Sequence, residues 1–354
     1  SGDKFVVLRS FERSEELEER FRWITEKLNG FSGDSRQFRV ELACGAYRME
    51  KPEDRLSLNE MLDRANIAEK SVKSLPGSHM AVYDEKMRSR VVRELAMEAA
   101  MADALRKEEF EMYLQPQISL KKSGVLRAEA LVRWRGADGK LIFPADFIGL
   151  FEREGIIFRL DYYMLEQACR FLKQWLRQQG RPLCISVNVS RTTMLQPDFT
   201  ENCRRLKRQY EIPDGYLELE FTEGVIVENH DIFREIVKGL QEHGFSCAMD
   251  DFGAEQSSLN ILKDIPMNVL KFDRRFFERG EYEERGRAVV ACMLNLAETL
   301  KMETVAEGVE TKEQADILKE MGCDFIQGYV YARPMPAGDY REFMERFLAG
   351  QREK

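Results

Sequence analysis

From residue 110 onward, short β-rich runs alternate with longer helical segments, and this alternation constrains the fold more than any other feature of the chain. Strands that are each followed by a helix pair in parallel, because the helix returns the chain to the same end of the sheet. Eight strands in about 250 residues predict closure into a (β/α)₈ barrel. The predicted strands are Glu111–Gln115, Gly124–Trp134, Leu183–Val189, Tyr216–Phe221, Ser246–Asp250, Asn268–Phe272, Glu303–Glu307 and Asp324–Tyr329.

The first two strands are joined differently from the others. The segment around Lys121-Lys122-Ser123-Gly124 is too short for a parallel crossover and suits a hairpin, so we expect the first strand to run antiparallel to the second. The predicted fold class is therefore α/β, a TIM-like barrel with an antiparallel first strand. Its predicted helices are Leu160–Gln179, Asp198–Tyr210, Ile232–His243, Arg287–Leu300 and Thr311–Met321.

Residues 1–84 predict a separate, small unit of mixed strands and helices. Its predicted elements are a strand at Phe5–Leu8, a helix at Leu17–Leu28, a pair of strands within Gln37–Met49 and a helix at Leu58–Lys73. Glu85 to Glu109 then runs without Gly or Pro, which favours one continuous helix. We assign 85–104 to a connecting helix and 105–354 to the barrel domain. The predicted packing stripe of this helix is Val91, Leu95, Met101 and Leu105.

Composition excludes several classes of protein. The net charge of −8 disfavours a protein that coats a nucleic-acid polymer, and the basic run Arg204–Arg208 is better explained as a solvated helix face. The seven cysteines are scattered without a C-x-x-C pair, which indicates buried thiols in a reducing compartment. With no signal peptide or long apolar stretch, we expect a cytoplasmic location. A sensor domain or membrane tether upstream of Ser1 is left open.

Polar residues stand where the predicted barrel strands end. In a barrel these ends meet at one rim, which carries the catalytic groups. Solvated loop residues are the alternative explanation, but so many polar endings converging on one rim favour a site. The residues are Gln115, Glu129, Asn188, Glu220, Asp250, Asp251, Lys271, Glu307 and Gln327.

The acidic members of this set predict a metal site. Carboxylates gathered in one mouth repel each other unless a cation neutralises them. Carboxylate and amide oxygens are hard ligands, and none of the three histidines stands at a strand end, so the set selects Mg²⁺ or Mn²⁺. The adjacent pair Asp250-Asp251 suits two ions that share a carboxylate. Lys271 would balance charge or stabilise charge developing on phosphorus. Arg133 is expected on the same face as Glu129, placed to bind a phosphate.

The same residues resemble the motifs of the EAL domain family. Glu129-Ala130-Leu131-Val132-Arg133-Trp134 resembles the motif that names the family, and the resemblance covers residues of about 105 to 345. The further matching motifs are Gln115-Pro116, Val187-Asn188-Val189-Ser190, Glu220-Phe221-Thr222-Glu223, Asp250-Asp251-Phe252-Gly253, Lys271-Phe272-Asp273, Glu307-Gly308-Val309-Glu310-Thr311 and Gln327-Gly328-Tyr329.

This resemblance implies a cyclic di-GMP phosphodiesterase of bacterial second-messenger signalling, which forms linear 5′-pGpG with Mg²⁺ or Mn²⁺. The implied metal ligands are Glu129, Asn188, Glu220, Asp250 and Asp251, for two ions. The implied catalytic residues are Glu307 as general base or ligand of the metal's water, with Lys271 and Gln327 positioning that water. The implied substrate contacts are Gln115, Leu131 and Arg133, and the implied supporting residues are Glu223 and Glu310, with Glu223 anchoring the loop after Asp251.

The loop after Asp251 departs from the family pattern. The usual continuation is Phe-Gly-Thr-Gly-Tyr-Ser-Ser, whereas this chain has Ala254, Glu255 and Gln256 in place of Thr, Gly and Tyr. A backbone conformation that only glycine adopts would be strained at Glu255. In the family this loop couples metal binding to dimerisation. Reduced activity, activity that depends on a partner, and a homodimer through the barrel domain are therefore left open.

The N-terminal unit resembles the second half of a GGDEF diguanylate cyclase domain. Ser1-Gly2-Asp3-Lys4-Phe5 stands at the naming motif, and Leu62–Lys70 resembles the last helix of that domain. Lys4 replaces the glutamate that binds metal, and a cation cannot serve as a ligand. The resemblance therefore implies a partial, degenerate domain without cyclase activity.

The sequence is compatible with three functions. The leading hypothesis is a phosphodiesterase that hydrolyses cyclic di-GMP. The alternative is a weak or inactive receptor that binds cyclic di-GMP and acts through a protein partner, favoured by the altered loop and opposed by the complete set of metal ligands. A scaffold that binds no nucleotide predicts no thermal shift with cyclic di-GMP.

Overall fold

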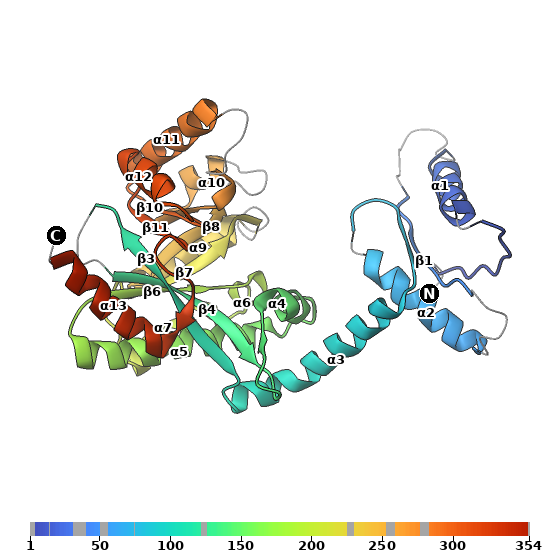
Figure 1. The fold of residues 1–354 in the computed structure, drawn as a ribbon, viewed down its shortest axis with the longest axis horizontal. Coiled ribbons are helices and arrows are strands. Elements are labelled where there is room, and N and C mark those ends of the chain that lie inside the picture. The colour runs from blue at the N-terminus through green and yellow to red at the C-terminus, as the bar shows by residue number, and fades with distance from the viewer. Residues whose placement is uncertain are drawn as a thin grey trace. The chain divides into compact units, whose positions relative to one another are not determined.

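The computed structural model describes residues 4–13, 15–30, 40–49, 56–73, 75–121, 126–224, 230–252, 259–276 and 283–352. The chain divides into two compact units, Ser1–Ala99 and Ala100–Lys354 (Figure 1).

The larger unit is a closed barrel of eight strands. β3, the first strand, is hydrogen-bonded to β4 and to β11, and it is antiparallel to both, while the remaining neighbours pair in parallel. This confirms the predicted barrel with an antiparallel first strand. The barrel strands are β3 (Phe110–Ser119), β4 (Leu126–Arg135), β6 (Leu183–Asn188), β7 (Leu217–Thr222), β8 (Ser246–Phe252), β9 (Val269–Phe272), β10 (Glu303–Ala306) and β11 (Phe325–Gln327). Two short strands, β5 (Leu141–Ile142) and β12 (Met335–Pro336), extend the sheet beside β4 and β3.

Helices lie around the barrel (Figure 1). The longest of them shows why they form: its buried residues recur every three or four positions, so one face covers the strands while the other meets water. A left-handed Gly180 ends it, with its backbone N–H donating to the carbonyl of Leu176. The helices of this unit are α4 (Pro144–Arg153), α5 (Ile157–Gln179), α6 (Arg191–Met194), α7 (Phe199–Gln209), α9 (His230–Glu242), α10 (Leu259–Asp264), α11 (Glu283–Thr299), α12 (Lys312–Glu320) and α13 (Ala337–Arg352), with a 3₁₀ turn at Arg274–Phe276. The predicted helices are confirmed to within a few residues at each end.

The barrel interior is layered by the strand registers. Side chains two apart on a strand share a face, so Arg127 and Glu129 on β4 both point inward, as do Glu218 and Glu220 on β7. Glu129 and Glu220 both contact Lys271, whereas Arg127 and Glu218 pair with each other about 6.6 Å farther down their strands, at two residues of strand rise. An apolar group that includes Val269 and Phe325 packs inside the barrel as well. The upper level is the mouth at the carboxyl ends of the parallel strands.

The smaller unit contains a parallel pair of strands with a helix between them in sequence. β1 (Ala43–Ala46) pairs with β2 (His79–Val82), and α2 (Leu58–Val72) packs against both. A capping box at Ser57 and Glu60 begins α2. The predicted helix at Leu17–Leu28 is confirmed as α1 (Glu15–Gly30).

Two predictions for this unit were wrong. The run Phe5–Leu8 is not a strand: it pairs with no other segment of the described chain, and its side chains are exposed. The segment Gln37–Met49 contributes the single strand β1 within its described part, and the partner of β1 comes from β2, farther along the chain. β-Branched and apolar residues favour an extended chain, but a strand needs a partner edge to form.

The predicted helix is confirmed as α3 (Glu85–Arg106), and its predicted packing stripe is correct at Met101 and wrong at Leu95. Leu95 is 59% exposed, and the buried positions are Met97, Met101 and Ala104. Apolar side chains and alanines occur on several faces of this helix, so periodicity alone does not single out one face.

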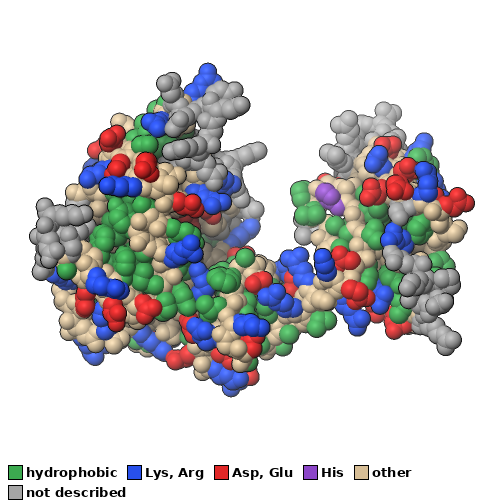
Figure 2. Space-filling model, in the orientation of Figure 1, with side chains coloured by type: hydrophobic (Ala, Val, Ile, Leu, Met, Phe, Trp, Pro, Cys, Tyr) green, Lys and Arg blue, Asp and Glu red, His purple; other side chains and the backbone are tan. Residues whose placement is uncertain are grey.

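The surface of the barrel unit carries interspersed acidic and basic side chains on the face that Figure 2 shows. The basic run Arg204–Arg208 lies on α7, but it is not wholly solvated as predicted. Lys207 is 6% exposed, and its ammonium donates to the carbonyl of His243 at 2.6 Å and pairs with Asp214.

No helix among the described residues has the length and apolar character needed to cross a membrane.

Candidate active site

The polar residues predicted at the strand ends gather at the mouth of the barrel. Glu129 lies on β4, Asn188 ends β6, Glu220 lies on β7, Asp250 and Asp251 lie on β8, Lys271 lies on β9, Glu307 follows β10, Gln327 ends β11 and Gln115 lies on β3. These side chains come from seven parallel strands and the antiparallel β3. The closure of the sheet therefore brings together residues that are far apart in sequence.

Lys271 is the hub of this cluster. Its side chain is 1% exposed and surrounded by four carboxylates. The ammonium nitrogen lies 2.7 Å from Glu220 Oε2, 2.7 Å from Glu307 Oε1, 3.2 Å from Asp250 Oδ1 and 3.7 Å from Glu129 Oε2. Burial alone would lower the pKa of Lys271, yet these carboxylates raise it well above its ordinary value. The mouth therefore holds a permanent cation.

Glu129 is fixed by two amide side chains. Asn188 Nδ2 donates to Glu129 Oε1 at 2.8 Å, and Gln327 Nε2 donates to Glu129 Oε2 at 2.5 Å. Burial would raise the pKa of Glu129, but Lys271 and these two donors outweigh it and hold that pKa below its ordinary value. Glu129 is therefore an ionised carboxylate with an oriented side chain.

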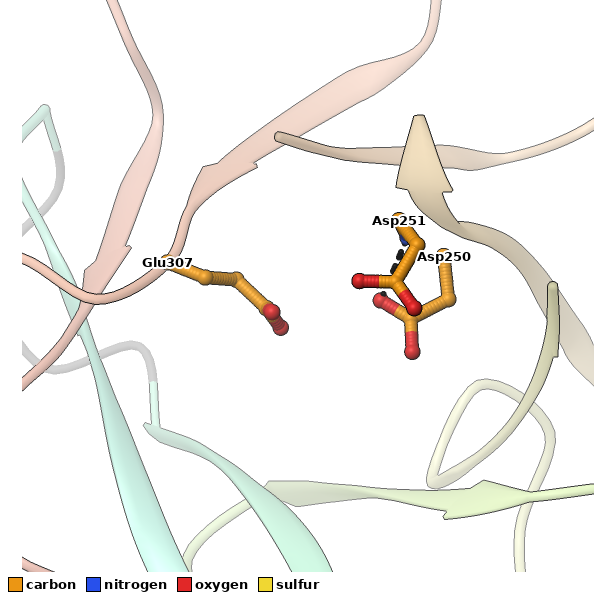
Figure 3. Close-up of side chains that lie close together, drawn as sticks. All are labelled: Asp250, Asp251 and Glu307. Atoms are coloured by element: carbon orange, nitrogen blue, oxygen red, sulfur yellow. Dashed lines mark hydrogen bonds between the residues drawn. The ribbon is translucent and has the colours of Figure 1, made fainter. Parts of the chain in front are cut away.

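Asp250 and Asp251 both face the mouth because β8 is irregular there. In a regular strand two consecutive side chains point to opposite faces. The β8–β9 register shifts between Met249 and Phe252, and Asp251 has a φ of 54°, in the left-handed region. Such a bulge turns the extra residue, and aspartate tolerates this conformation better than most residues. Figure 3 shows Glu307 pointing toward both aspartates, and the three residues offer carboxylate oxygens that all lie within 4.8 Å of one another.

The other acids of the cluster have raised pKa values, because burial and neighbouring carboxylates disfavour their charged forms. Burial raises the pKa of Glu307 to about 8, against the opposing effect of Lys271 and with Asp250 adding to the rise. Burial likewise raises the pKa of Glu220 well above its ordinary value, and the pKa of Asp251 is raised by burial and by Asp250. One lysine does not balance so many carboxylates, so the site takes up protons or another cation.

The donor set fits a divalent metal ion. Glu220 Oε1 is buried, and no donor in the described part of the chain reaches it. A buried carboxylate oxygen without a partner is costly, and a cation would satisfy it. Asp250, Asp251 and Glu307 supply hard oxygen ligands at a spacing that would hold one ion. The predicted ligands Glu129 and Glu220 contact Lys271, which also contacts Asp250 and Glu307 of this trio. Asn188 donates a hydrogen bond to Glu129 and so belongs to the same cluster.

Two glycines allow the backbone to bring Glu307 and Gln327 to the mouth. Gly308 has a φ of +64°, and a Cβ there would meet Arg274 Cβ at 2.5 Å. A Cβ on Gly328 would lie 2.0 Å from the carbonyl oxygen of Val309. The backbone N–H of Val309 donates to the carbonyl of Gln327 at 3.1 Å, so these close approaches join the ends of β10 and β11.

Arg133 lies at the rim, where sequence analysis placed a phosphate contact. Its guanidinium carbon lies 5.5 Å from the ring centre of Tyr113 and 5.4 Å from that of Phe143. Phe143 is 54% exposed, so its ring is accessible beside Arg133. Leu131, the other predicted contact on β4, is half-buried and paired in register with Tyr113. Sequence analysis missed Tyr113 and Phe143, since an isolated aromatic residue carries no positional signal.

The two predicted supporting residues lie at the edge of the cluster. Glu223 follows β7 and is buried. Glu310 has an exposed side chain, and its backbone N–H donates to Gln314 Oε1 at the start of α12. The altered loop at residues 254–256 lies outside the described residues, so the anchoring role of Glu223 stays a prediction.

Sequence analysis also missed a second group of buried polar residues, centred on Arg127 one level below the mouth. The available signal was alternation: Gln117 follows Gln115 by two residues, and Arg127 precedes Glu129 by two, which places each pair on one face of a strand.

Comparison with known proteins places this site in a family. The sequence profile described as EAL domain matches residues 98–334. The chain is 30% identical over 348 residues to the cyclic di-GMP phosphodiesterase NbdA of Pseudomonas aeruginosa, covering 98% of this chain and 44% of NbdA. It is 29% identical over 286 residues to MucR of the same organism, a bifunctional diguanylate cyclase/cyclic di-GMP phosphodiesterase, covering 81% of this chain and 42% of MucR.

A solved structure agrees with these relatives. The PaMucR phosphodiesterase in complex with c-di-GMP matches with a TM-score of 0.64 and 30% sequence identity, covering 69% of this chain and 99% of that one. The chain spans less than half the length of the two curated relatives. Because the family profile covers well over half of the sequence and the barrel carries the family's motif residues at its mouth, the chain belongs to the EAL domain family.

Proposed function

We propose that this protein hydrolyses cyclic di-GMP to linear 5′-pGpG in bacterial second-messenger signalling. The observation that carries the proposal is the trio Asp250, Asp251 and Glu307, whose carboxylate oxygens lie within 4.8 Å of one another beside a buried lysine. Relatives about 30% identical are named as cyclic di-GMP phosphodiesterases, and the solved PaMucR structure contains c-di-GMP. Both support the nucleotide as substrate.

The metal would be Mg²⁺ or Mn²⁺, as two ions. Asp250, Asp251 and Glu307 would hold it together with Glu129, Asn188 and Glu220. Bound there, such ions polarise a phosphoryl oxygen and lower the pKa of water.

The protein's own groups would do the remaining work. The ammonium of Lys271 is held charged and in place, ready to stabilise negative charge that develops on the phosphodiester. Gln327 would hold the attacking water with it, and the Glu307 carboxylate, which lies beside both aspartates, would orient that water or accept its proton. Arg133 and Gln115 would bind the substrate, with Leu131 beside them.

The test is an assay for pGpG after incubation with cyclic di-GMP and either Mg²⁺ or Mn²⁺. We expect turnover that EDTA abolishes and that Glu307→Gln lowers by at least about a hundredfold. Glu298→Gln is the matched control, because Glu298 lies on α11, away from the cluster. An inactive wild-type protein, or a Glu307→Gln variant as active as wild type, would overturn the proposal.

The second candidate is a cyclic di-GMP receptor that acts through a protein partner. The observation that favours it is the position of Lys271, which already neutralises part of the mouth and would admit an anionic nucleotide without metal. Calorimetry with cyclic di-GMP in EDTA and in Mg²⁺ separates the two functions. Tight binding in EDTA together with no product in Mg²⁺ supports the receptor. Binding in Mg²⁺ with turnover supports the enzyme.

For the N-terminal unit we propose a partial GGDEF-like domain without cyclase activity. Lys4 forms an ion pair with Glu69 at 3.6 Å, so the residue at the position of the family's metal-binding glutamate is a cation held by an acid. Incubation with GTP and Mg²⁺ should yield no cyclic di-GMP.

We further propose a cytoplasmic enzyme, part of a longer chain with a sensor or tether, that dimerises through the barrel. Specific activity that rises with protein concentration would support the dimer.

A further inference from the structure

The barrel contains a second buried charge cluster, one level below the mouth. The guanidinium of Arg127 donates to both carboxylate oxygens of Glu218 at 2.6 Å and to Glu303 at 2.8 Å. Ser246 Oγ donates to Glu218 Oε2 at 2.8 Å. Arg127 is 6% exposed and Glu218 is fully buried, so the pair is shielded from water. Nη2 contacts both oxygens of Glu218 and Nη1 contacts Glu303, so charged hydrogen bonds on both nitrogens hold the guanidinium in place.

One guanidinium nitrogen of Arg127 points away from these acids and toward the mouth. Arg127 Nε donates to Gln117 Oε1 at 3.2 Å, and Gln117 Nε2 donates to Gln327 Oε1 at 2.9 Å. Gln117 is the cross-strand partner of Arg127 on β4 and of Gln327 on β11. The amide nitrogen of Gln327 then donates to Glu129 Oε2 at 2.5 Å and to Gln115 Oε1 at 3.2 Å.

The chemistry of these groups allows one orientation of the chain of bonds. A side-chain amide has a donor end and an acceptor end, whereas arginine donates only. Arg127 therefore requires the carbonyl end of Gln117, which leaves the amino end of Gln117 for Gln327. That in turn requires the carbonyl end of Gln327 and directs its amino end to the carboxylate of Glu129. Gln117 is 1% exposed, so no solvent competes for either end.

We propose that Arg127 and Gln117 are positioning residues that orient the amide of Gln327, and through it the carboxylate of Glu129, for the metal site at the mouth. The inference rests on the proposed function for the roles of Gln327 and Glu129. It assigns a task to residues that touch neither metal nor substrate. Hydrogen bonds that orient metal ligands typically change metal affinity by 10–100-fold when they are lost.

The test is the affinity for Mn²⁺ alone, measured from free Mn²⁺ by electron paramagnetic resonance in the full chain. Gln117→Glu keeps the size and the acceptor for Arg127 but removes the donor for Gln327. Gln327 then turns its amino end to the introduced carboxylate. Its carbonyl oxygen faces Glu129, and the two oxygens repel each other. We expect Mn²⁺ affinity to fall by about tenfold. Ser246→Ala is the matched control, because it removes a hydrogen bond from the same cluster without involving Gln117, and it should leave the affinity unchanged.

A double-mutant cycle separates positioning from the added charge. In a Gln327→Met background, Gln117→Glu should have no further effect on Mn²⁺ affinity, since the relay is already cut. An equal loss in both backgrounds, or a Gln117→Glu variant that binds Mn²⁺ like wild type, would overturn the inference. Gln117→Met, which removes both bonds without a charge, repeats the cycle if Gln117→Glu does not fold.

The readouts keep the two proposals apart. An inactive wild type that binds Mn²⁺ and shows the cycle would overturn the phosphodiesterase alone. An active wild type whose Mn²⁺ affinity is indifferent to Gln117→Glu would overturn the positioning role alone.

Discussion

The barrel holds two buried charge clusters on the same strands, one at the mouth and one a level below. In the lower cluster one arginine faces Glu218 and Glu303, and its guanidinium donates to both acids. In the upper cluster one lysine faces four carboxylates, Asp251 lies alongside, and Glu220 Oε1 has no donor among the described residues. The two cations are both buried, and the clusters differ in charge balance and hydrogen-bond satisfaction.

That difference separates a structural ion pair from a site. A buried charge is tolerated when it is paired and its hydrogen bonds are made, as around Arg127. The mouth violates this rule several times within one cluster, and such violations concentrate where a protein binds an ion or a substrate. Changes in the upper cluster should therefore act directly on turnover, whereas changes around Arg127 should act first on stability and reach the metal site only through Gln117.

The largest effect is expected for Lys271→Met. It removes the cation that faces the reacting phosphate, and turnover should fall by about a thousandfold while the far-UV circular dichroism stays native in Mg²⁺. Lys173→Met, which removes a surface ion pair with Glu211 at 2.9 Å, is the control and should keep full activity. A Lys271→Met variant that retains more than about a tenth of the wild-type activity would break the comparison.

Arg127→Met should act mainly on stability, beside the lower metal affinity expected when Gln117 loses its donor. It leaves Glu218 buried and unpaired, and removing one partner of a buried pair costs about 3–5 kcal/mol. Urea unfolding followed by circular dichroism measures this loss. The double variant Arg127→Met/Glu218→Leu removes the stranded charge and should regain most of the loss, because apolar replacements of buried pairs are often neutral. A single variant as stable as wild type would show that the lower cluster is not structural.

The stability of the metal-free protein should depend on pH through the upper cluster. The Glu307 carboxyl has its folded-state pKa raised from 4.5 to about 8, so the folded protein binds a proton that the unfolded chain releases. Its contribution to stability is fully present below the unfolded pKa and is lost as pH rises through about 8. Without metal, the melting temperature should therefore decrease as the pH is raised from 4.5 to about 8.

Excess Mg²⁺ should flatten this slope, because the ion replaces the proton. Glu307→Gln should flatten it without metal. Arg127 adds nothing in this range, since burial lowers its pKa but Glu218 and Glu303 outweigh burial and raise the pKa further above the range. A metal-free melting temperature that is constant or rises with pH across this window would contradict the assignment.

Sequence predicted the fold and most of the mouth because both depend on local patterns. A strand that ends on a polar residue is visible in the sequence, and the barrel then gathers those ends. What sequence missed depends on particular backbone and side-chain geometry. The left-handed backbone at Asp251, which turns two consecutive aspartates to one side, leaves no local trace, and neither does the acceptor that Gln117 presents to Arg127. Phe5–Leu8 failed for a related reason, because propensity does not supply a partner strand.

The smallest expected effect compares two serines of the same sheet, the half-buried Ser246 and the buried Ser186. Ser246→Ala removes the hydroxyl that donates to Glu218 and should cost about 1 kcal/mol with turnover unchanged. Ser186 is 1% exposed, and its hydroxyl has no hydrogen-bond partner in the described part of the chain. Ser186→Ala removes a group that is buried without compensation, so the free energy of unfolding should stay the same or rise. Urea unfolding of both variants decides the point, because equal losses would mean that the bond to Glu218 adds nothing to the lower cluster.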